Sequence, residues 1–463
     1  MRRGHVHPGK MPTGGCSPDD IVDIPDESEP LFLGVEEMTK DSFVTEISSD
    51  WSRNSRWKYI QRPYTAEDVV RLRGSIQIEY TLARLGSERL WSLLNTETFV
   101  QTMAAYTGIQ AIHQVRAGLQ AINVSGACVA NDGNDSGEMY PDEGLYPVSS
   151  VPNAVRRINN ALRRADQIAH AEGKRDVYWL VPIKADGEAG FGGVLNTFEL
   201  TKDLIEAGAA AISFEDQLPA AKKCGHLAGK VLVPASEYIR KLIAARLATD
   251  VMGVPTILIA RTDSKDAGLI TSDIDSDDQS FLTGKRTADG YWETRGGLAA
   301  AIDRGLAYAP YADLLWFETS SPDLEEARQF SEAIHAKFPG KLLYYNCSSS
   351  FYWKKTLNDT AIAQFQPELA KLGYKFQNCS RMGLSSMYLS LYNAARAYRQ
   401  EGMPAYAALQ ESQLHATAQG EGYGDWKHHH FVGTGYFDDV AKTIVGTELS
   451  TAALIGSTEE KQF

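Results

Sequence analysis

The sequence predicts a TIM-like (β/α)8 barrel with an N-terminal helical region and a helical C-terminal extension. The first observation is an alternation of eight short apolar runs with amphipathic helical stretches, which is typical of a parallel barrel. The second is that polar residues end seven of these runs, where barrel enzymes place their active sites. The eight predicted strands are residues 99–106, 119–124, 177–184, 209–214, 256–261, 313–317, 341–345 and 373–379.

The remaining elements are predicted from helical periodicity and from capping residues. Residues 41–94 have a helical pattern interrupted at Pro63, and Thr65 with Asp68 is typical of a capped helix start. Within the barrel, helices are expected over residues 198–207, 236–248 and 323–337, and a C-terminal helical stretch over 384–419. The predicted divisions are a disordered segment 1–35, a helical region 36–97, the catalytic barrel 98–383, and helices with a loop or lid-like tail over 384–463.

Composition limits the classes of function. The 463 residues carry 46 basic and 59 acidic side chains, a net charge of −13, which argues against a nucleic-acid binder. No apolar run approaches the ~20 residues of a membrane span, so no membrane partner is expected. The cysteines are odd in number and form no CxxC pair, which favours a reducing, cytoplasmic location. They are Cys16, Cys128, Cys224, Cys347 and Cys379.

The segment Lys222-Lys223-Cys224-Gly225-His226-Leu227 places a thiol between two lysines and a histidine, shortly after the acidic run that contains Glu215. Positive neighbours lower the pKa of a thiol, so we expect Cys224 to reach the thiolate form near neutral pH and to act as an acid/base group. The alternative is a buried structural cysteine beside surface lysines. The charged flanks of the thiol argue against that alternative.

Four carboxylates follow predicted strands, at Asp142, Asp186, Glu188 and Glu215. An all-oxygen donor set without a histidine pair favours Mg²⁺ or Mn²⁺ over Zn²⁺. The alternative, ordinary surface acids, has most weight for Asp142. Asp186 lies in the glycine-rich stretch Ala-Asp-Gly-Glu-Ala-Gly-Phe-Gly-Gly, which lets backbone approach an anion but matches no nucleotide-binding motif.

Further polar residues suit a carboxylic-acid substrate. Arg261 is the best candidate for a bidentate carboxylate clamp, and its alternative is a salt bridge to a neighbouring strand end. Asn346 and the serines after it supply short donors for a second carboxylate. Adjacent histidines cannot all converge on one ion, so a loop is expected at residues 428–430. Cys128 and Cys347 are expected in the core.

These motifs resemble the isocitrate lyase family, within the isocitrate lyase and phosphoenolpyruvate mutase superfamily. The resemblance runs from about residue 40 to the end and rests on the cysteine hexapeptide, the glycine-rich stretch, Tyr140-Pro-Asp, Ile259-Ala-Arg-Thr-Asp, Asn346-Cys-Ser and the closing Gly456-Ser-Thr-Glu-Glu-Lys-Gln-Phe. It implies Mg²⁺-dependent cleavage of a 2-hydroxy tricarboxylate into succinate and glyoxylate. It also implies a homotetramer with swapped C-terminal helices.

The resemblance also assigns roles to matching residues. Asp186 binds the metal, with Asp142, Glu188 and Glu215 beside it or reached through water. The catalytic set is Cys224, His226 and Glu215, with Cys224 as the acid that protonates the nascent succinate carbanion. Ser125 and Gly126, with Arg261, match the glyoxylate side. The succinate side matches Gly225, His226, Asn346, Ser348 and Ser350, with Glu318 near them, and Ala127, Ser380 and Arg381 complete the wall.

Several wall residues depart from the family pattern. Asn123 stands where Tyr is usual, Ala127 where Trp is usual, Ser213 where His is usual, and Arg381 where Leu is usual. The first three are expected to open space beside the glyoxylate half, and Arg381 to add an unpaired charge near the succinate half. The changes favour a substituted or larger analogue of isocitrate. The alternatives are ordinary isocitrate cleavage and an inactive regulatory paralogue, against which the intact Asp186, Cys224 and Arg261 argue.

Overall fold

The computed structural model describes residues 40–418, 423–424, 427–446 and 449–461. Eight parallel strands form the predicted barrel, in the spatial order β1-β12-β11-β10-β6-β4-β3-β2. A parallel bridge between Ala104 and Asn123 joins the first strand to the second and closes the ring. The strands are β1 (Val100–Met103), β2 (Ile122–Val124), β3 (Ile183–Asp186), β4 (Ala211–Glu215), β6 (Ile257–Thr262), β10 (Leu314–Phe317), β11 (Leu342–Asn346) and β12 (Tyr374–Cys379).

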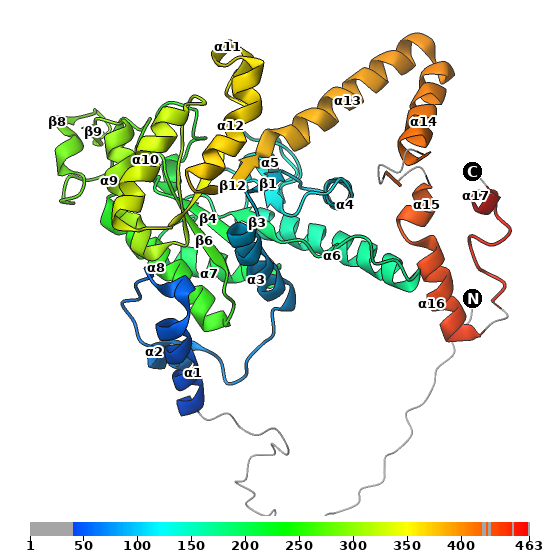
Figure 1. Cartoon of the computed structure of the whole chain (residues 1–463), viewed down its shortest axis with the longest axis horizontal. Helices are drawn as coiled ribbons and strands as arrows, with labels where there is room; N and C mark the ends of the chain where they lie inside the picture. Colours follow the sequence, from blue (N-terminus) through cyan, green and yellow to red (C-terminus); the bar gives the residue numbers. More distant parts are fainter. Residues whose placement is uncertain (1–39, 419–422, 425–426, 447–448, 462–463) are drawn as a thin grey trace, which may run out of the picture.

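Helices surround the ring (Figure 1). All eight predicted strands are present, but the predicted 177–184 run forms a strand only from Ile183, because Pro182 has no N–H to give to the ladder. The helix expected over 323–337 is present, and Asp323 caps it by accepting the N–H groups of Glu325 and Glu326. The helices are α4 (Gly108–Arg116), α5 (Gly126–Asn131), α6 (Ser150–Ala171), α7 (Val194–Glu206), α8 (Ala235–Met252), α9 (Leu298–Tyr308), α10 (Leu324–Lys337), α11 (Trp353–Thr356) and α12 (Asp359–Lys371), with the short 3₁₀ turns η2 (Pro219–Ala221) and η4 (Ala309–Tyr311).

The N-terminal region closes one end of the barrel. Its elements are α1 (Lys40–Arg53), η1 (Ser55–Trp57), α2 (Ala66–Leu72) and α3 (Thr81–Thr96). The predicted capping box at Thr65 and Asp68 is present, with both reciprocal hydrogen bonds. Leu90 and Leu94 of α3 are fully buried against the amino ends of the barrel strands. The candidate cavity opens at the opposite, carboxyl end of the strands.

A second, small sheet was not predicted. It has the order β5-β7-β9-β8, and its strands are β5 (Val231–Leu232), β7 (Leu269–Ile270), β8 (Leu282–Arg286) and β9 (Trp292–Thr294), with η3 (Gln279–Phe281) between them. The strands are two to five residues long, and β8 is largely exposed and carries Lys285 and Arg286. Such short, partly charged strands lack the apolar alternation on which strand prediction depends.

The C-terminal region is helical, as predicted, and α13 and α14 extend away from the barrel (Figure 1). The predicted loops are wrong at two places, since residues 428–431 and 434–445 form helices. Asp438 in the second of these helices accepts the N–H groups of Ala453 and Leu454. These residues are too distant in the sequence for a local pattern to reveal the contact. The elements are α13 (Ser380–Glu401), α14 (Met403–Ala418), α15 (His428–Phe431), α16 (Thr434–Val445) and α17 (Thr458–Lys461).

Some predictions fall outside the described residues. The predicted disordered segment 1–35 is one, and the final Gln462-Phe463 is another. Within the described ranges, the helices are all too short or too polar to cross a bilayer.

A buried arginine ties the small sheet to the barrel. Arg304 of α9, 3% exposed, donates to Asp216 at 2.8 Å and to Asp278 at 2.7 Å. Its partners come from the end of β4 and from the segment beside η3. The guanidinium therefore compensates two buried carboxylates at once.

Replacing Arg304 with Met is expected to lower the free energy of unfolding by about 3–5 kcal/mol, because both carboxylates lose their buried cation. Chemical denaturation followed by circular dichroism measures the change. The control is Arg328→Met, which removes an exposed pair with Glu325 and Glu332 on α10 and should cost less than about 1 kcal/mol. Equal losses in the two variants would contradict the role of Arg304.

Candidate active site

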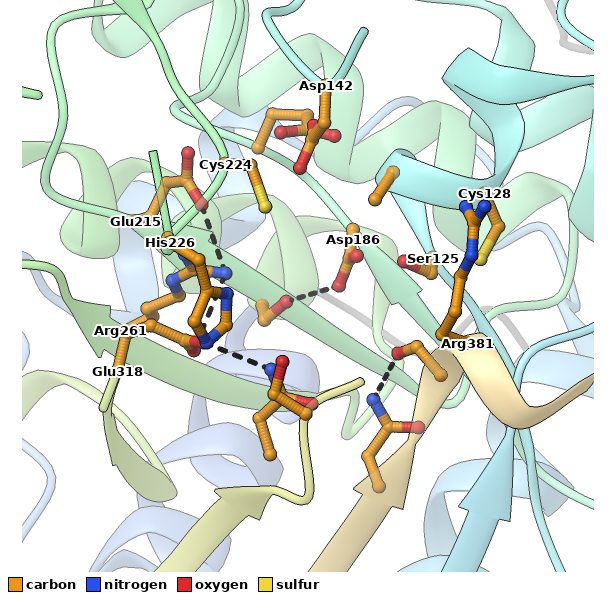
Figure 2. A pocket seen from close by; sticks show the side chains of 18 of the residues that line it. Ser125, Cys128, Asp142, Asp186, Glu215, Cys224, His226, Arg261, Glu318 and Arg381 are labelled. Carbon is orange, nitrogen blue, oxygen red and sulfur yellow. Dashed lines mark hydrogen bonds and ion pairs between the residues drawn. The ribbon is translucent and has the colours of Figure 1, made fainter. Parts of the chain in front are cut away.

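A cavity of about 230 Å³ opens at the carboxyl ends of the barrel strands. Every predicted site residue except Gly126 lines it, and Gly126 lies directly behind, with its N–H on Asp186. Figure 2 shows the side chains converging from strands that are far apart in the sequence. The predicted residues that line the cavity are Ser125, Ala127, Asp142, Asp186, Glu188, Glu215, Cys224, Gly225, His226, Arg261, Glu318, Asn346, Ser348, Ser350, Ser380 and Arg381.

Asp186, the last residue of β3, is held by three donors. Its Oδ2 accepts the N–H of Gly126 at 2.9 Å, and its Oδ1 accepts the Ser213 hydroxyl at 3.0 Å and the ammonium of Lys184. Burial opposes ionisation of Asp186, but the Lys184 charge and these hydrogen bonds outweigh burial, so the pKa lies below its usual value. Asp186 is therefore an ionised, oriented carboxylate.

The other three carboxylates surround one lysine. The ammonium of Lys222 forms ion pairs with Asp142 and Glu188 and lies 4.0 Å from Glu215. Burial raises the pKa of Glu188, with Lys222 opposing and Asp142 adding to the rise. Burial also raises the pKa of Glu215 well above its usual value, against the opposing charge of Arg261. More negative groups meet here than the local cations compensate.

Two backbone features allow this crowding. Glu188 has φ of 51°, in the left-handed region that a non-glycine residue rarely occupies, and its side chain accepts the buried Tyr146 hydroxyl at 2.5 Å. A Cβ at Gly126 would lie 1.7 Å from Glu188 Oε1, so only glycine fits at that position. The left-handed backbone of Glu188 and the absence of a side chain at Gly126 together allow the Glu188 carboxylate to lie in the cluster.

The cluster has the chemistry of a divalent cation site. Its donors are oxygens from four carboxylates, which suit Mg²⁺ or Mn²⁺. Burial raises the pKa values of Glu188 and Glu215, and neighbouring carboxylates add to the rise, so a bound cation would favour their charged forms. These residues therefore fit the predicted metal.

Cys224 differs from its prediction in charge state. Burial, followed by the negative charge of Asp142, raises the pKa of the thiol to about 12. The expected lowering does not occur because Lys222 turns towards the carboxylates and Lys223 pairs with Glu143 at 3.2 Å. The thiol is therefore protonated at neutral pH, and it can give a proton but is not a resting thiolate.

Arg261 matches the alternative given for it, a salt bridge to neighbouring strand ends. Its Nε and Nη2 bind the two oxygens of Asp263 at 3.0 and 2.9 Å, so the bidentate face is already used. Its Nη1 lies 3.5 Å from Glu215 and 3.9 Å from Glu318. The cavity thus receives a guanidinium whose Nη1 pairs loosely with Glu215 and Glu318, and not the predicted two-pronged clamp.

A second polar group is built around Glu318. Its Oε1 accepts the amide of Asn346 at 3.0 Å and lies 3.4 Å from His226 Nε2. A Cβ at Gly225 would approach Glu318 Cγ to 2.5 Å, so glycine is required there too. Nearby, the Ser348 hydroxyl accepts the N–H of Ser350 at 3.1 Å.

Arg381 lies on the opposite side from its predicted place. Figure 2 shows it beside Ser125 and Cys128, away from His226 and Glu318. Its guanidinium donates to Asn131 of α5, so it is not the unpaired charge that was expected. The reason is that α13 begins at Ser380 and directs Arg381 across β1 towards α5.

Asn123, another departure from the family pattern, belongs to a hydrogen-bonded group of side chains beside the cavity. Asn123 donates to the Ser380 hydroxyl at 3.0 Å, and Asn378 donates to the same oxygen at 2.5 Å. Ala127 and Ser213 line the cavity, whereas Asn123 does not. Asn123 therefore does not open space in the cavity, because its side chain contacts Ser380 instead.

Several site residues escaped sequence reasoning. Lys184 lies in an apolar strand run two residues before Asp186, and a lysine in such a run was a usable signal. Trp316 lies with its ring 4.4 Å from the Arg261 guanidinium, but an aromatic residue in a buried strand gives no distinct signal. Cys128 is buried, as predicted, yet it also lines the cavity.

The histidine run lies outside this cavity. His428 and His429 have ligand atoms within 4.8 Å of each other and of Glu459, while His430 pairs with Glu172 at 2.7 Å. As expected, the three histidines do not converge on one point. Only His428 and His429 lie together, with Glu459.

Comparison with known proteins gives the family to which the chain is similar. The sequence model of the isocitrate lyase family matches residues 44–287 and 284–463. Isocitrate lyase of Halalkalibacterium halodurans is 57% identical over 417 residues, covering 90% of this chain and 97% of the relative. Isocitrate lyase 1 of Mycobacterium tuberculosis is 55% identical over 419 residues, with the same coverage of 90% and 97%.

The fold agrees with a solved structure of the same superfamily. A 2,3-dimethylmalate lyase, described as a PEP mutase/isocitrate lyase superfamily member, superposes with a TM-score of 0.54 at 20% identity and covers 80% of this chain and 98% of its own. The high identity to isocitrate lyases argues against both the substituted-analogue prediction and the inactive paralogue. The alternative of ordinary isocitrate cleavage fits these findings better.

Proposed function

Because the chain belongs to the isocitrate lyase family, and is therefore a carbon–carbon lyase, we propose that it cleaves isocitrate into succinate and glyoxylate. The observation that carries the proposal is that one cavity gathers the Cys224 thiol, the carboxylates around Asp186 and the guanidinium of Arg261. The names of the similar proteins support the choice of isocitrate.

The carboxylates Asp186, Asp142, Glu188 and Glu215 would hold Mg²⁺ or Mn²⁺, which when bound stabilises negative charge on the substrate hydroxyl oxygen. Asp186 is the best oriented of the four, since three donors fix its carboxylate. The family resemblance places Ser125 and Gly126 on the glyoxylate side. The cation Arg261, which borders the same cavity, balances the charge of a substrate carboxylate.

In the reaction, the hydroxyl gives its proton to one of the carboxylates that line the cavity, and the bond between the hydroxyl-bearing carbon and its neighbour breaks. The hydroxyl-bearing carbon becomes the aldehyde of glyoxylate. The electron pair of the broken bond stays on the carbon that becomes succinate, and that carbon takes a proton. Cys224 is the donor of this proton, since its thiol is neutral and lines the cavity.

Donors for the succinate half lie around Glu318, on the side of the cavity away from Ser125 (Figure 2). His226, Asn346, Ser348 and Ser350 border the cavity around Glu318. His226 and Asn346 both touch Glu318, which fixes their orientation. These fixed dipoles suit a dianion that forms as the carbon–carbon bond breaks.

The test is steady-state cleavage of isocitrate by the purified chain, with glyoxylate release as the readout. A kcat/KM of roughly 10⁴ M⁻¹s⁻¹ or more is expected, in the ordinary enzyme range. Methylisocitrate is the comparison substrate, and it should be cleaved less efficiently. Faster cleavage of methylisocitrate would contradict the proposed substrate and restore the larger-analogue interpretation.

We further propose a homotetramer that exchanges the C-terminal helices. Helices α13 and α14 extend away from the barrel and expose large apolar side chains, which a monomer rarely leaves in water (Figure 1). They include Leu389, Leu391, Tyr392, Tyr398, Met403, Tyr406 and Leu409.

A further inference from the structure

Lys184 is a buried lysine inside the barrel, below the cavity. It lies two residues before Asp186 on β3, so both side chains face the barrel interior. Lys184 is 1% exposed, and its ammonium lies 5.4 Å from the ring centroids of Trp316 and Tyr344. Its ion-pair partner is Asp186. A buried ammonium is costly to place, and here it is directed at the best-oriented carboxylate of the cluster.

The contacts of Asp186 leave one of its oxygens available to the cavity. Oδ1 accepts two donors, the Lys184 ammonium and the Ser213 hydroxyl. Oδ2 accepts a single backbone N–H, from Gly126, and so keeps a lone pair. The side chain of Asp186 is 20% exposed, so this carboxylate can be reached from the cavity. A cation entering the cluster would therefore meet Oδ2.

Two lysines, Lys222 and Lys184, form ion pairs with the carboxylates of the cluster, and they lie on different kinds of backbone, a loop and a strand. Lys222 belongs to the loop between η2 and Cys224, so a movement of that loop can carry its ammonium away from Asp142 and Glu188. Lys184 belongs to a central barrel strand hydrogen-bonded on both sides, to β2 and β4. Its charge therefore stays beside Asp186 when a cation binds.

We propose that the charge of Lys184, which stays beside Asp186, weakens the binding of a divalent cation to that carboxylate. The inference deepens the proposed function and rests on its metal site. Two like charges a few ångströms apart repel strongly in a buried site. Neutralising Lys184 should therefore strengthen cation binding, whereas general damage to the site would weaken it.

The experiment is a titration of metal-free protein with Mn²⁺, without substrate, following free Mn²⁺ by electron paramagnetic resonance. Lys184→Met and Lys184→Gln should each bind Mn²⁺ about tenfold more tightly than the unsubstituted chain, or tighter still. The control is Lys341→Met, which removes another buried ammonium, bonded to the Ala309 carbonyl at 2.6 Å at the opposite end of the barrel. Its Mn²⁺ affinity should not change.

Unchanged or weaker Mn²⁺ binding by a folded Lys184 variant would overturn the proposal. The Gln variant decides if the Met variant does not fold, since its amide keeps a polar group next to Asp186. Glyoxylate release from isocitrate is measured separately on the unsubstituted chain. If the unsubstituted chain cleaves isocitrate but binds no Mn²⁺, the role of Lys184 is overturned and the isocitrate reaction stands. If the Lys184 variants bind Mn²⁺ more tightly but the unsubstituted chain does not cleave isocitrate, the role of Lys184 stands and the proposed reaction is overturned.

Discussion

Cys224→Ser is expected to lower kcat for isocitrate cleavage by about 10²–10⁴ while leaving the fold intact. The thiol is the neutral acid of the cavity, because burial and the charge of Asp142 raise its pKa to about 12. A serine hydroxyl has nearly the same shape but releases its proton much less readily, so the carbanion that becomes succinate would not be protonated in time.

The matched control is Cys379→Ser. Cys379 is also a free, partly buried thiol, but it does not line the cavity. Its substitution should leave kcat within a few-fold of the starting value, and circular dichroism should show both variants folded. A folded Cys224→Ser protein with near-normal turnover would remove the thiol from the mechanism.

Removing divalent cations is expected to abolish activity, and adding Mg²⁺ or Mn²⁺ back should restore it. The reason is the all-oxygen cluster of carboxylates, in which burial disfavours the charged forms of Glu188 and Glu215 and raises their pKa values. A bound divalent cation would favour those charged forms. Activity is measured after exhaustive chelation, and then after stepwise addition of each metal.

Zn²⁺ is the control cation, since it prefers nitrogen and sulfur ligands and should rescue poorly. Circular dichroism of the chelated protein should match that of the untreated protein, because the barrel core lies apart from the cluster. Full activity in excess chelator, or rescue by Zn²⁺ alone, would show that the carboxylates serve another purpose.

Local patterns in the sequence were sufficient for the barrel. Each of its strands is a short apolar run, and a buried parallel strand must be apolar on both faces. The helical N-terminal and C-terminal regions followed from periodicity and from caps such as Thr65. The small sheet and α16 escaped prediction, since β8 is short and exposed and α16 depends on contacts that Asp438 makes with the distant Ala453 and Leu454.

The strand-end members of the cavity were also predictable, because polar residues that end parallel strands meet at one edge of the barrel. Ala127, Gly225, His226 and Ser350 came from the family resemblance. The state of the cavity residues was not predictable. Lys222 was expected to lower the pKa of Cys224, but it turns to Asp142 and Glu188. Arg261 was expected to present two donors, but Asp263 occupies them. Arg381 was expected near Glu318, but it contacts Asn131.

The sequence by itself determined the barrel, the family motifs and the strand-end residues of the cavity, because hydrophobic period and strand-end polarity are local properties of the chain. Only the tertiary structure decided which cation pairs with which carboxylate, that the thiol of Cys224 is protonated, and that Lys184 reaches Asp186 from inside the barrel. The physical reason is that charge interactions depend on distance and burial. Both are set by side chains that lie far apart in the sequence and meet only when the barrel closes.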